Sequence, residues 1–146
     1  MSRPVPDTRA AYAHFEPLAT RWADNDIYGH MNNAVHYQLF DTAVNGFLVR
    51  RGILDMGQSE TVFLVVSSSC DYFAELAFPD RVDAGLRVAR LGSSSVRYEI
   101  GLFQGDAETA AAQGHFVHVN VGRADRKPQP MAGPVRAILQ ELVVAG

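Results

Sequence analysis

The chain has 146 residues and a mass of 16.0 kDa, which corresponds to one domain of ordinary size. Its 47% hydrophobic content is enough for a substantial core and excludes a disordered tail. A net charge of −3 excludes a nucleic-acid binder held by phosphate neutralisation, and no apolar run is long enough to span a membrane.

The N-terminal part of the chain shows no hydrophobic periodicity. Residues 1–13 contain two prolines, which predicts a flexible leader before a single domain over residues 14–146. This leader lacks the apolar segment of a signal peptide, so a cytoplasmic location is the default expectation. A first strand is expected from Phe15 to about Ala23, where the turn-forming residues of Asp24-Asn25-Asp26 end it.

One long helix is expected next. Gly29 and the asparagines that follow mark its start, and Gly52 marks its end. Its polar positions, Gln38, Asp41, Thr42 and Asn45, form a single narrow stripe, and the remaining positions are mostly apolar. A helix that is apolar nearly all round is typical of a buried helix.

Four strands are expected after the helix. Thr61–Val66 is a β-branched and aromatic run typical of a buried strand. The segments 82–88, 96–102 and 116–121 each alternate with period two, as strands with one buried face do. In the last of them, Val117, Val119 and Val121 alternate with Phe116, His118 and Asn120.

The connections complete the predicted order. Short turns are expected at Gly92-Ser93 and Gly105-Asp106, and Ala107–Ala112 is interpreted as the start of the last strand. Pro134 suits the first turn of a short C-terminal helix. The result is an α+β fold with a five-stranded antiparallel sheet wrapped around one long buried helix, and its remaining apolar surfaces predict a dimer.

The residues before the long helix carry two chemical features. Asp24 and Asp26 lie two apart, so in extended chain their carboxylates face the same side, where one can act as a base or nucleophile. Such residues also serve as turn and N-cap residues. The first N–H groups of a helix lack internal partners, so they can stabilise an oxyanion. This combination favours hydrolysis of an acyl compound with an apolar tail.

The same residues form a motif. Arg21-Trp-Ala-Asp-Asn-Asp-Ile-Tyr-Gly-His-Met-Asn-Asn33, followed by Tyr37 and Phe40-Asp-Thr-Ala43, resembles the opening motif of hotdog-fold acyl-CoA thioesterases of the 4-hydroxybenzoyl-CoA thioesterase class. The resemblance continues in shorter pieces and covers about residues 15 to 135. It implies a hotdog fold, and no cofactor is expected.

The resemblance also implies roles for individual residues. Asp26, three residues before Gly29, matches the catalytic aspartate, which attacks the thioester carbonyl or activates water. Asn33, seven residues further on, matches the backbone N–H donor to the oxyanion in the first turn of the helix. Gly29 allows close approach of the backbone at the turn. The stretch from His30 through Asn32 to Asn33 is similar to that of members acting on fatty acyl groups.

Further residues are candidates of second rank. Some relatives place the catalytic acid on the long helix, which makes Asp41 the second candidate, while His30, Asn32 and Tyr37 are candidate substrate contacts. Without a functional role, His30 would be a histidine at the helix start bonded to backbone, and Tyr37 would be a core residue. The histidines show no metal-ligand spacing, so no metal is predicted.

The expected function is therefore hydrolysis of an aliphatic acyl-CoA to the free acid and CoA, by a homodimer or a dimer of dimers. A hairpin of Gly92-Ser-Ser-Ser95 stands where some relatives are basic, so Arg90, Arg126 and Lys127 are the candidates to meet the CoA phosphates, with the partner subunit as the alternative. The alternatives are a non-catalytic acyl-CoA-binding module and a hotdog dehydratase; Asp26 argues against the first, and the motif spacing against the second.

Overall fold

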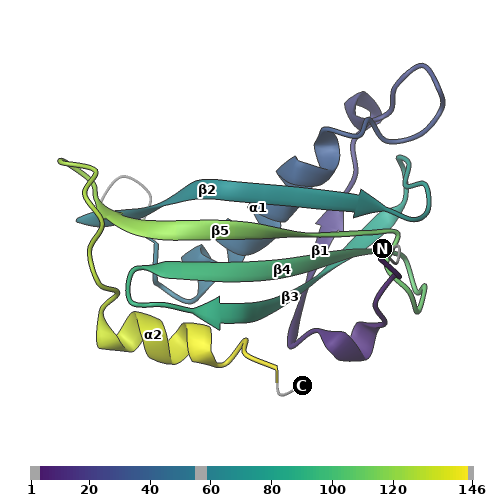
Figure 1. Ribbon diagram of the computed structural model, residues 1–146. Coiled ribbons are helices and arrows are strands. Elements are labelled where there is room, and N and C mark those ends of the chain that lie inside the picture. Colours follow the sequence, from purple (N-terminus) through teal and green to yellow (C-terminus); the bar gives the residue numbers. More distant parts are fainter. Residues whose placement is uncertain (1–3, 55–58, 145–146) are drawn as a thin grey trace.

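Five strands form one antiparallel sheet in the computed structural model, which describes residues 4–54 and 59–144 (Figure 1). The order across the sheet is β1-β3-β4-β5-β2. The strands are β1 (His14–Ala19), β2 (Thr61–Tyr72), β3 (Arg81–Leu91), β4 (Ser95–Gln104) and β5 (Ala112–Gly122). The predicted α+β architecture is confirmed, although β1 ends earlier than expected, before a short 3₁₀ turn, η2 (Trp22–Asp24).

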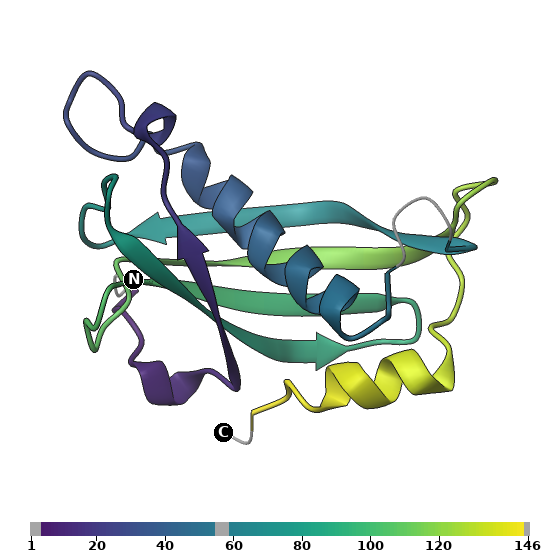
Figure 2. The ribbon, with the colours of Figure 1, turned by 180° about the vertical axis from the view of Figure 1, so that it is seen from behind.

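The long helix α1 (Val35–Arg50) lies diagonally across one face of the sheet (Figure 2). Its apolar side, including Phe40, Val44 and Leu48, is fully buried, whereas Gln38, Asp41 and Thr42 remain exposed, as the polar stripe predicts. The expected start at Gly29–Asn33 is wrong, because these residues form a loop and a turn that lead into the helix. Because Gln38, Asp41 and Thr42 are exposed, one side of the helix faces solvent and the sheet does not enclose it completely.

The alternating pattern places the strands β3 and β4 correctly. Val82, Leu86, Tyr98 and Ile100 lie in the core beneath α1. Residues 107–111, expected as strand, instead form a loop before β5, in which Thr109 bridges to Thr8.

Strand β2 differs from expectation, and in β5 the structure decides which of the two alternating sets faces the helix. β2 is an edge strand, and Leu64, Val65 and Val66 are exposed rather than buried, with a bulge between Val65 and Ser67. In β5 the helix-facing positions are Phe116, His118 and Asn120, while the valines between them are half-buried on the opposite face.

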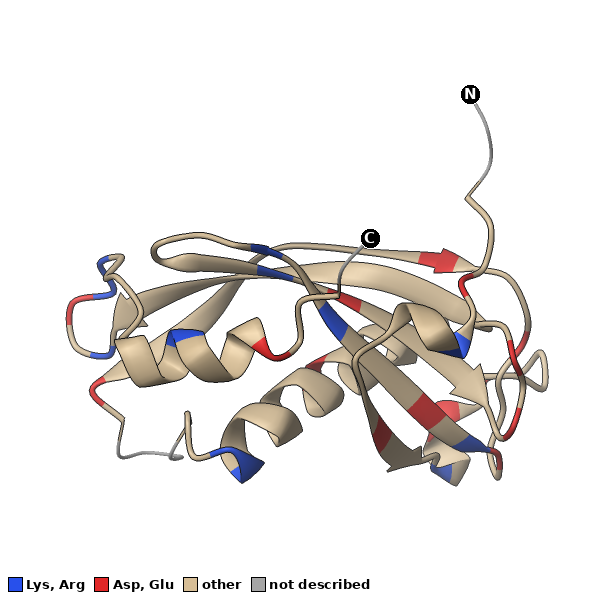
Figure 3. Ribbon diagram, turned by 90° about the horizontal axis from the view of Figure 1, so that it is seen from below, with Lys and Arg blue, Asp and Glu red and all other residues tan. Residues whose placement is uncertain are grey.

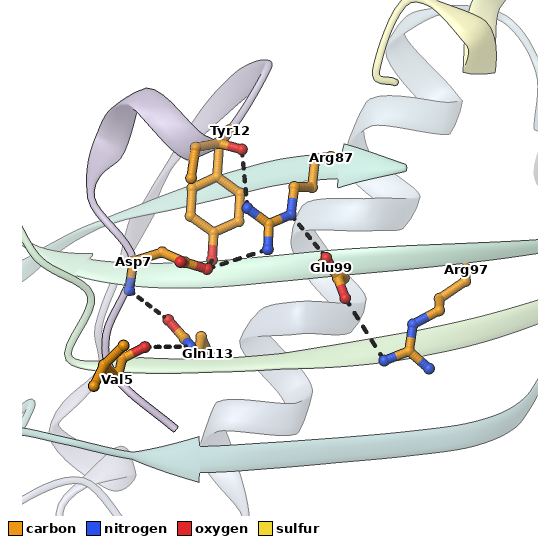
Figure 4. A network of polar contacts seen from close by, with 8 residues as sticks. Val5, Asp7, Tyr12, Arg87, Arg97, Glu99 and Gln113 are labelled. Carbon is orange, nitrogen blue, oxygen red and sulfur yellow. Dashed lines mark hydrogen bonds and ion pairs between the residues drawn. The ribbon is translucent and has the colours of Figure 1, made fainter. Parts of the chain in front are cut away.

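The N-terminal segment packs against the sheet face opposite α1, so the expectation of a flexible leader does not describe residues 7–12. Gly85 and Gly101 leave room for the Tyr12 ring, which packs edge-on against Phe103. Arg87 donates hydrogen bonds to the Asp7 and Glu99 carboxylates, at 3.1 and 2.8 Å, and its guanidinium lies over the Tyr12 ring (Figure 4).

The C-terminal helix α2 (Gly133–Gln140) begins with Pro134 in its first turn, as predicted. Its residue Leu139 is fully buried, and the neighbouring Glu141 accepts two hydrogen bonds from Arg51, at 2.7 and 2.9 Å. Among the described residues, no helix is both long and apolar enough to cross a membrane.

In the part of the chain that the structure describes, two buried polar side chains under α1 have no hydrogen-bond partner. Neither ring nitrogen of His118 nor the hydroxyl of Tyr98 has a partner, and the two rings meet edge-on at 5.3 Å. Burial lowers the pKa of His118 to about 4, so the ring is neutral in the folded protein at pH 7.

The folded protein should therefore lose stability in acid through His118. Below its ordinary pKa of 6.5 the unfolded chain binds a proton at this position that the folded chain does not. Between pH 7 and pH 4, wild type should lose about 3 kcal/mol more free energy of unfolding than His118→Phe. Urea unfolding at both pH values measures the difference, and equal losses in the two proteins would contradict it.

Candidate functional site

The loop between β1 and α1 carries most of the predicted site residues and projects beyond the edge of the sheet (Figure 1). A bridge between Asn25 and Met31 closes it, and Gly29 adopts a φ of +83°, which a residue with a side chain rarely does. The tip is apolar and exposed, with Ile27 at 93% and Tyr28 at 77%.

Asp24 and Asp26 have different environments. Asp24 is 1% exposed and accepts hydrogen bonds from the backbone and guanidinium of Arg21, so its role is to hold the turn. Asp26 is half-buried, and one of its carboxylate oxygens accepts the Tyr28 N–H at 2.8 Å. Its other oxygen has no hydrogen-bond partner in the described part of the chain, which leaves it able to accept a proton or attack a carbonyl.

Nearly all backbone N–H groups at the N-terminal end of α1, which we call the mouth of the helix, donate hydrogen bonds within the protein. Those of Met31 and Asn32 donate to carbonyls of Leu76 and Asp24, and those of Ala34 and Val35 donate to the Asn32 side-chain oxygen and carbonyl. In the described structure only Asn33 in this run has an N–H without an acceptor. Asn33 precedes the helix rather than lying in its first turn, but its N–H is the free donor.

The direction of this N–H follows from peptide planarity. The Asn32 carbonyl and the Asn33 N–H belong to one trans peptide, so they point in opposite directions. The carbonyl accepts the Val35 N–H at 2.9 Å and so points towards the helix. The Asn33 N–H therefore points away from α1, as an oxyanion donor at a helix mouth requires.

A cavity of about 230 Å³ lies beside Asn33. One wall comes from the loop before α1 and its first turn, and the other from the end of β2 and the segment after it. Its lining residues are His30, Met31, Asn33, His36, Tyr72, Phe73, Ala74, Glu75 and Leu76. Asp26 is joined to this wall through its backbone N–H, which donates to the His30 carbonyl at 3.0 Å.

The other sequence candidates lie outside this cavity or serve the backbone. Asn32 caps the turn before α1, and the His30 ring makes a 3.1 Å contact with the carbonyl of Met31. Tyr37 is half-buried and packs against Phe40. Asp41 is exposed and accepts a hydrogen bond from Asn45 at 2.8 Å, along the open side of the helix.

Three polar residues of the cavity were not singled out as site residues from the sequence. His36 and Tyr72 pack edge-on at 4.7 Å, and Glu75 is the one carboxylate among the lining residues. His36 stands in a mostly apolar part of the helix, and Tyr72 follows the largely polar run 67–71 at the end of β2, so neither position carries a pattern that indicates a site. Among the described residues, no group of three or more His, Cys, Asp and Glu side chains is placed to hold a metal ion.

The candidate cations for CoA phosphates lie far from this mouth. Arg126 and Lys127 stand on the loop between β5 and α2, at the end of the sheet opposite the β1–α1 loop (Figures 1 and 3). Arg90 lies near the end of β3, next to the same end of the sheet. Within one protomer the cations and Asn33 thus lie at opposite ends of the sheet, because Tyr72, which is bonded to the Asn33 carbonyl, pairs with the first residue of β5, whereas Arg126 and Lys127 follow its last.

Comparison with known families decides what kind of protein carries this site. A family model described as thioesterase-like superfamily matches residues 20–139. The chain belongs to the thioesterase-like superfamily. It is accordingly a thioester hydrolase, as the sequence predicts, and the match includes the β1–α1 loop, α1 and all strands after it.

Solved structures agree with this fold for the thioesterase. PA5185 from Pseudomonas aeruginosa strain PAO1 is 52% identical, with 95% of this chain and 97% of that chain covered and a TM-score of 0.93. Slr0204, a 1,4-dihydroxy-2-naphthoyl-CoA thioesterase from Synechocystis, is 18% identical over 86% of this chain and 94% of its own, with a TM-score of 0.77.

One curated relative also matches the thioesterase. It is YsmA, an uncharacterized protein of Bacillus subtilis (strain 168), which is 22% identical over 93 residues. The match covers 64% of this chain and 63% of that relative.

Proposed function

We propose that this thioesterase hydrolyses an aliphatic acyl-CoA to the free acid and CoA, with Asp26 as base or nucleophile. The observation that carries the proposal is the free Asn33 N–H, which points out of the mouth of α1 beside a cavity. When a nucleophile attacks a thioester carbonyl bound there, negative charge would develop on its oxygen next to this donor. The partial positive charge at the N-terminus of α1 also stabilises an anion at that place.

The proposed chemistry needs one more group. Asp26 lies on the same loop, its backbone is bonded to His30, which lines the cavity, and one carboxylate oxygen is unpartnered. That oxygen either attacks the carbonyl carbon to form an anhydride, releasing CoA thiolate, or removes a proton from an attacking water. In the first route water then hydrolyses the anhydride, which regenerates the Asp26 carboxylate and supplies the proton for CoA, so both routes end with free acid and CoA.

The acyl specificity is the finer part of the proposal. Met31, Phe73, Ala74 and Leu76 give the cavity apolar walls, and the motif after Gly29 resembles that of fatty-acyl members within the 4-hydroxybenzoyl-CoA thioesterase class. The Synechocystis neighbour is named for an aromatic acyl group, so an aromatic substrate is the competing possibility.

Release of free thiol across a panel of acyl-CoAs tests the function. We expect turnover of straight-chain acyl-CoAs to exceed that of benzoyl-CoA and hydroxybenzoyl-CoA by at least about tenfold, because the cavity has apolar walls and the motif after Gly29 resembles that of fatty-acyl members. Preference for the aromatic thioesters would overturn the aliphatic assignment. Binding of acyl-CoA without thiol release from any of them would instead favour the non-catalytic binding module.

We also propose that the protein works in the cytoplasm as a homodimer, or a dimer of such dimers, joined through β2. This edge strand exposes Leu64, Val65 and Val66, and an uncovered apolar edge favours pairing with another strand. A second copy paired there in antiparallel fashion would bring the distant cations of one protomer towards the mouth of the other. A monomer in sedimentation at micromolar concentration would contradict this arrangement.

A further inference from the structure

Two side chains outside the proposed chemistry converge on the backbone of Asn33. The Tyr72 hydroxyl donates to the Asn33 carbonyl at 2.7 Å, and the His36 Nδ1 lies 3.2 Å from the same oxygen. Tyr72 ends β2, whereas His36 lies in the first turn of α1. The carbonyl next to the free N–H therefore accepts hydrogen bonds from two separate elements.

The protonation of these two groups is determined by their surroundings. A carbonyl can only accept, so the Nδ1 of His36 must carry the hydrogen. His36 is 3% exposed and burial lowers its pKa, which keeps the ring neutral near pH 7. Partial burial raises the pKa of the Tyr72 hydroxyl above its ordinary value, so that group remains a donor.

These contacts fix the second of two consecutive peptide planes. The plane that contains the Asn33 N–H is held by the hydrogen bond from the Val35 N–H to the Asn32 carbonyl. The next plane contains the Asn33 carbonyl, held by Tyr72 and His36, and the Ala34 N–H, held by the Asn32 side chain at 3.0 Å. With both planes held, the backbone rotations at Asn33 between them are fixed too.

We infer that Tyr72 is a positioning residue for thioester hydrolysis: with His36, its hydroxyl holds the Asn33 carbonyl and so fixes the direction of the Asn33 N–H. The inference rests on the proposed oxyanion role of that N–H. Catalytic donors act by being oriented before charge develops, so an unheld donor loses part of its effect. Tyr72 provides this hydrogen bond although it lies outside the motif that contains Asp26 and Asn33.

The variant Tyr72→Phe removes one oxygen and keeps the ring against His36. Loss of an oxyanion donor costs about 10²–10³-fold in kcat, and loss of its support should cost less, about tenfold. We expect that fall in kcat with KM for acyl-CoA within about twofold of wild type. Tyr12→Phe is the matched control, because it removes a hydroxyl 3.5 Å from Asp7 on the opposite face of the sheet.

Two CoA analogues separate positioning from substrate contact. An acyl-CoA thioether lacks the carbonyl and should bind Tyr72→Phe as tightly as wild type. A trifluoromethyl ketone analogue becomes an oxyanion when water or a nucleophile of the site adds to its carbonyl, and it should bind the variant about tenfold more weakly. Equal weakening of both analogues would show that Tyr72 contacts the substrate itself and would overturn the inference.

Variants of His36 test the same carbonyl independently. His36→Leu removes the donor and should lower kcat, whereas His36→Asn places an amide N–H near the Nδ1 position and should restore part of the loss. Full activity in both Tyr72→Phe and His36→Leu would overturn the inference. The proposed function would still stand if Asp26→Asn were inactive in the same assay, so the two failures are distinguishable.

Discussion

Asp26→Asn is expected to lower kcat for acyl-CoA hydrolysis by about 10³-fold, because an amide can neither accept the proton nor attack the carbonyl. Asparagine retains the oxygen that accepts the Tyr28 N–H, so the loop between Asn25 and Met31 should keep its conformation. Thiol release under saturating substrate measures the loss. An unchanged melting temperature shows that the fold is intact.

The control and the competing assignments use the same assay. Asp106→Asn removes a fully exposed carboxylate that pairs with Arg81, and its turnover should match wild type. Near-normal turnover of Asp26→Asn would contradict the assignment. Asp41→Asn, on the open side of α1, and Glu75→Gln, in the cavity wall, would then be the variants in which the activity should disappear.

Gly114→Ala is expected to produce the largest loss of stability from a single methyl group. A Cβ at this position in β5 would lie 1.9 Å from the Ser69 carbonyl oxygen of β2 and 2.9 Å from the Phe40 ring of α1. The first neighbour is backbone of a paired strand, and the second is fully buried, so neither can move without disturbing the core.

The expected cost is at least about 3 kcal/mol in the free energy of unfolding, the upper part of the range for overpacked cores. For a domain of this size that lowers the melting temperature by about 10 °C. Gly133→Ala is the matched control, since no atom lies within 4 Å of its Cβ position in the first turn of α2, and it should be neutral or slightly stabilising. Equal melting temperatures for the two variants would show that β2 and β5 can separate at Gly114 without cost.

Local sequence patterns predicted the structure correctly where it depends on residues nearby in the chain or on a single buried face of a strand. The alternation in β3 and β4 identified their buried faces because both strands have a core on one side. Pro134 placed the start of α2, since proline suits a first helical turn. The motif from Arg21 to Asn33 marked the loop that holds Asp26 and the free N–H, because the turn residues act within that short segment.

Those patterns failed where the partner of a residue is distant. A β-branched run such as Thr61–Val66 is equally suited to a central strand and to an apolar edge, and only the strand order makes β2 an edge. In β5 the alternation left open whether the valines or Phe116, His118 and Asn120 face the core. The ring of His118 packs against Phe63 and Tyr98, and Asn120 donates to the Gln129 carbonyl at 3.1 Å. Alternation identifies two faces without saying which of them meets the helix.

By itself, then, the sequence determined one α+β domain built on alternating strands and a long helix, together with the loop that carries a thioesterase motif. Folding decided which groups surround that loop. The Tyr72 hydroxyl meets the Asn33 carbonyl across 39 positions of the chain, and Arg87 meets Asp7 across 80. Contacts of this kind depend on strand order and on how α1 crosses the sheet, and no local pattern contains that information.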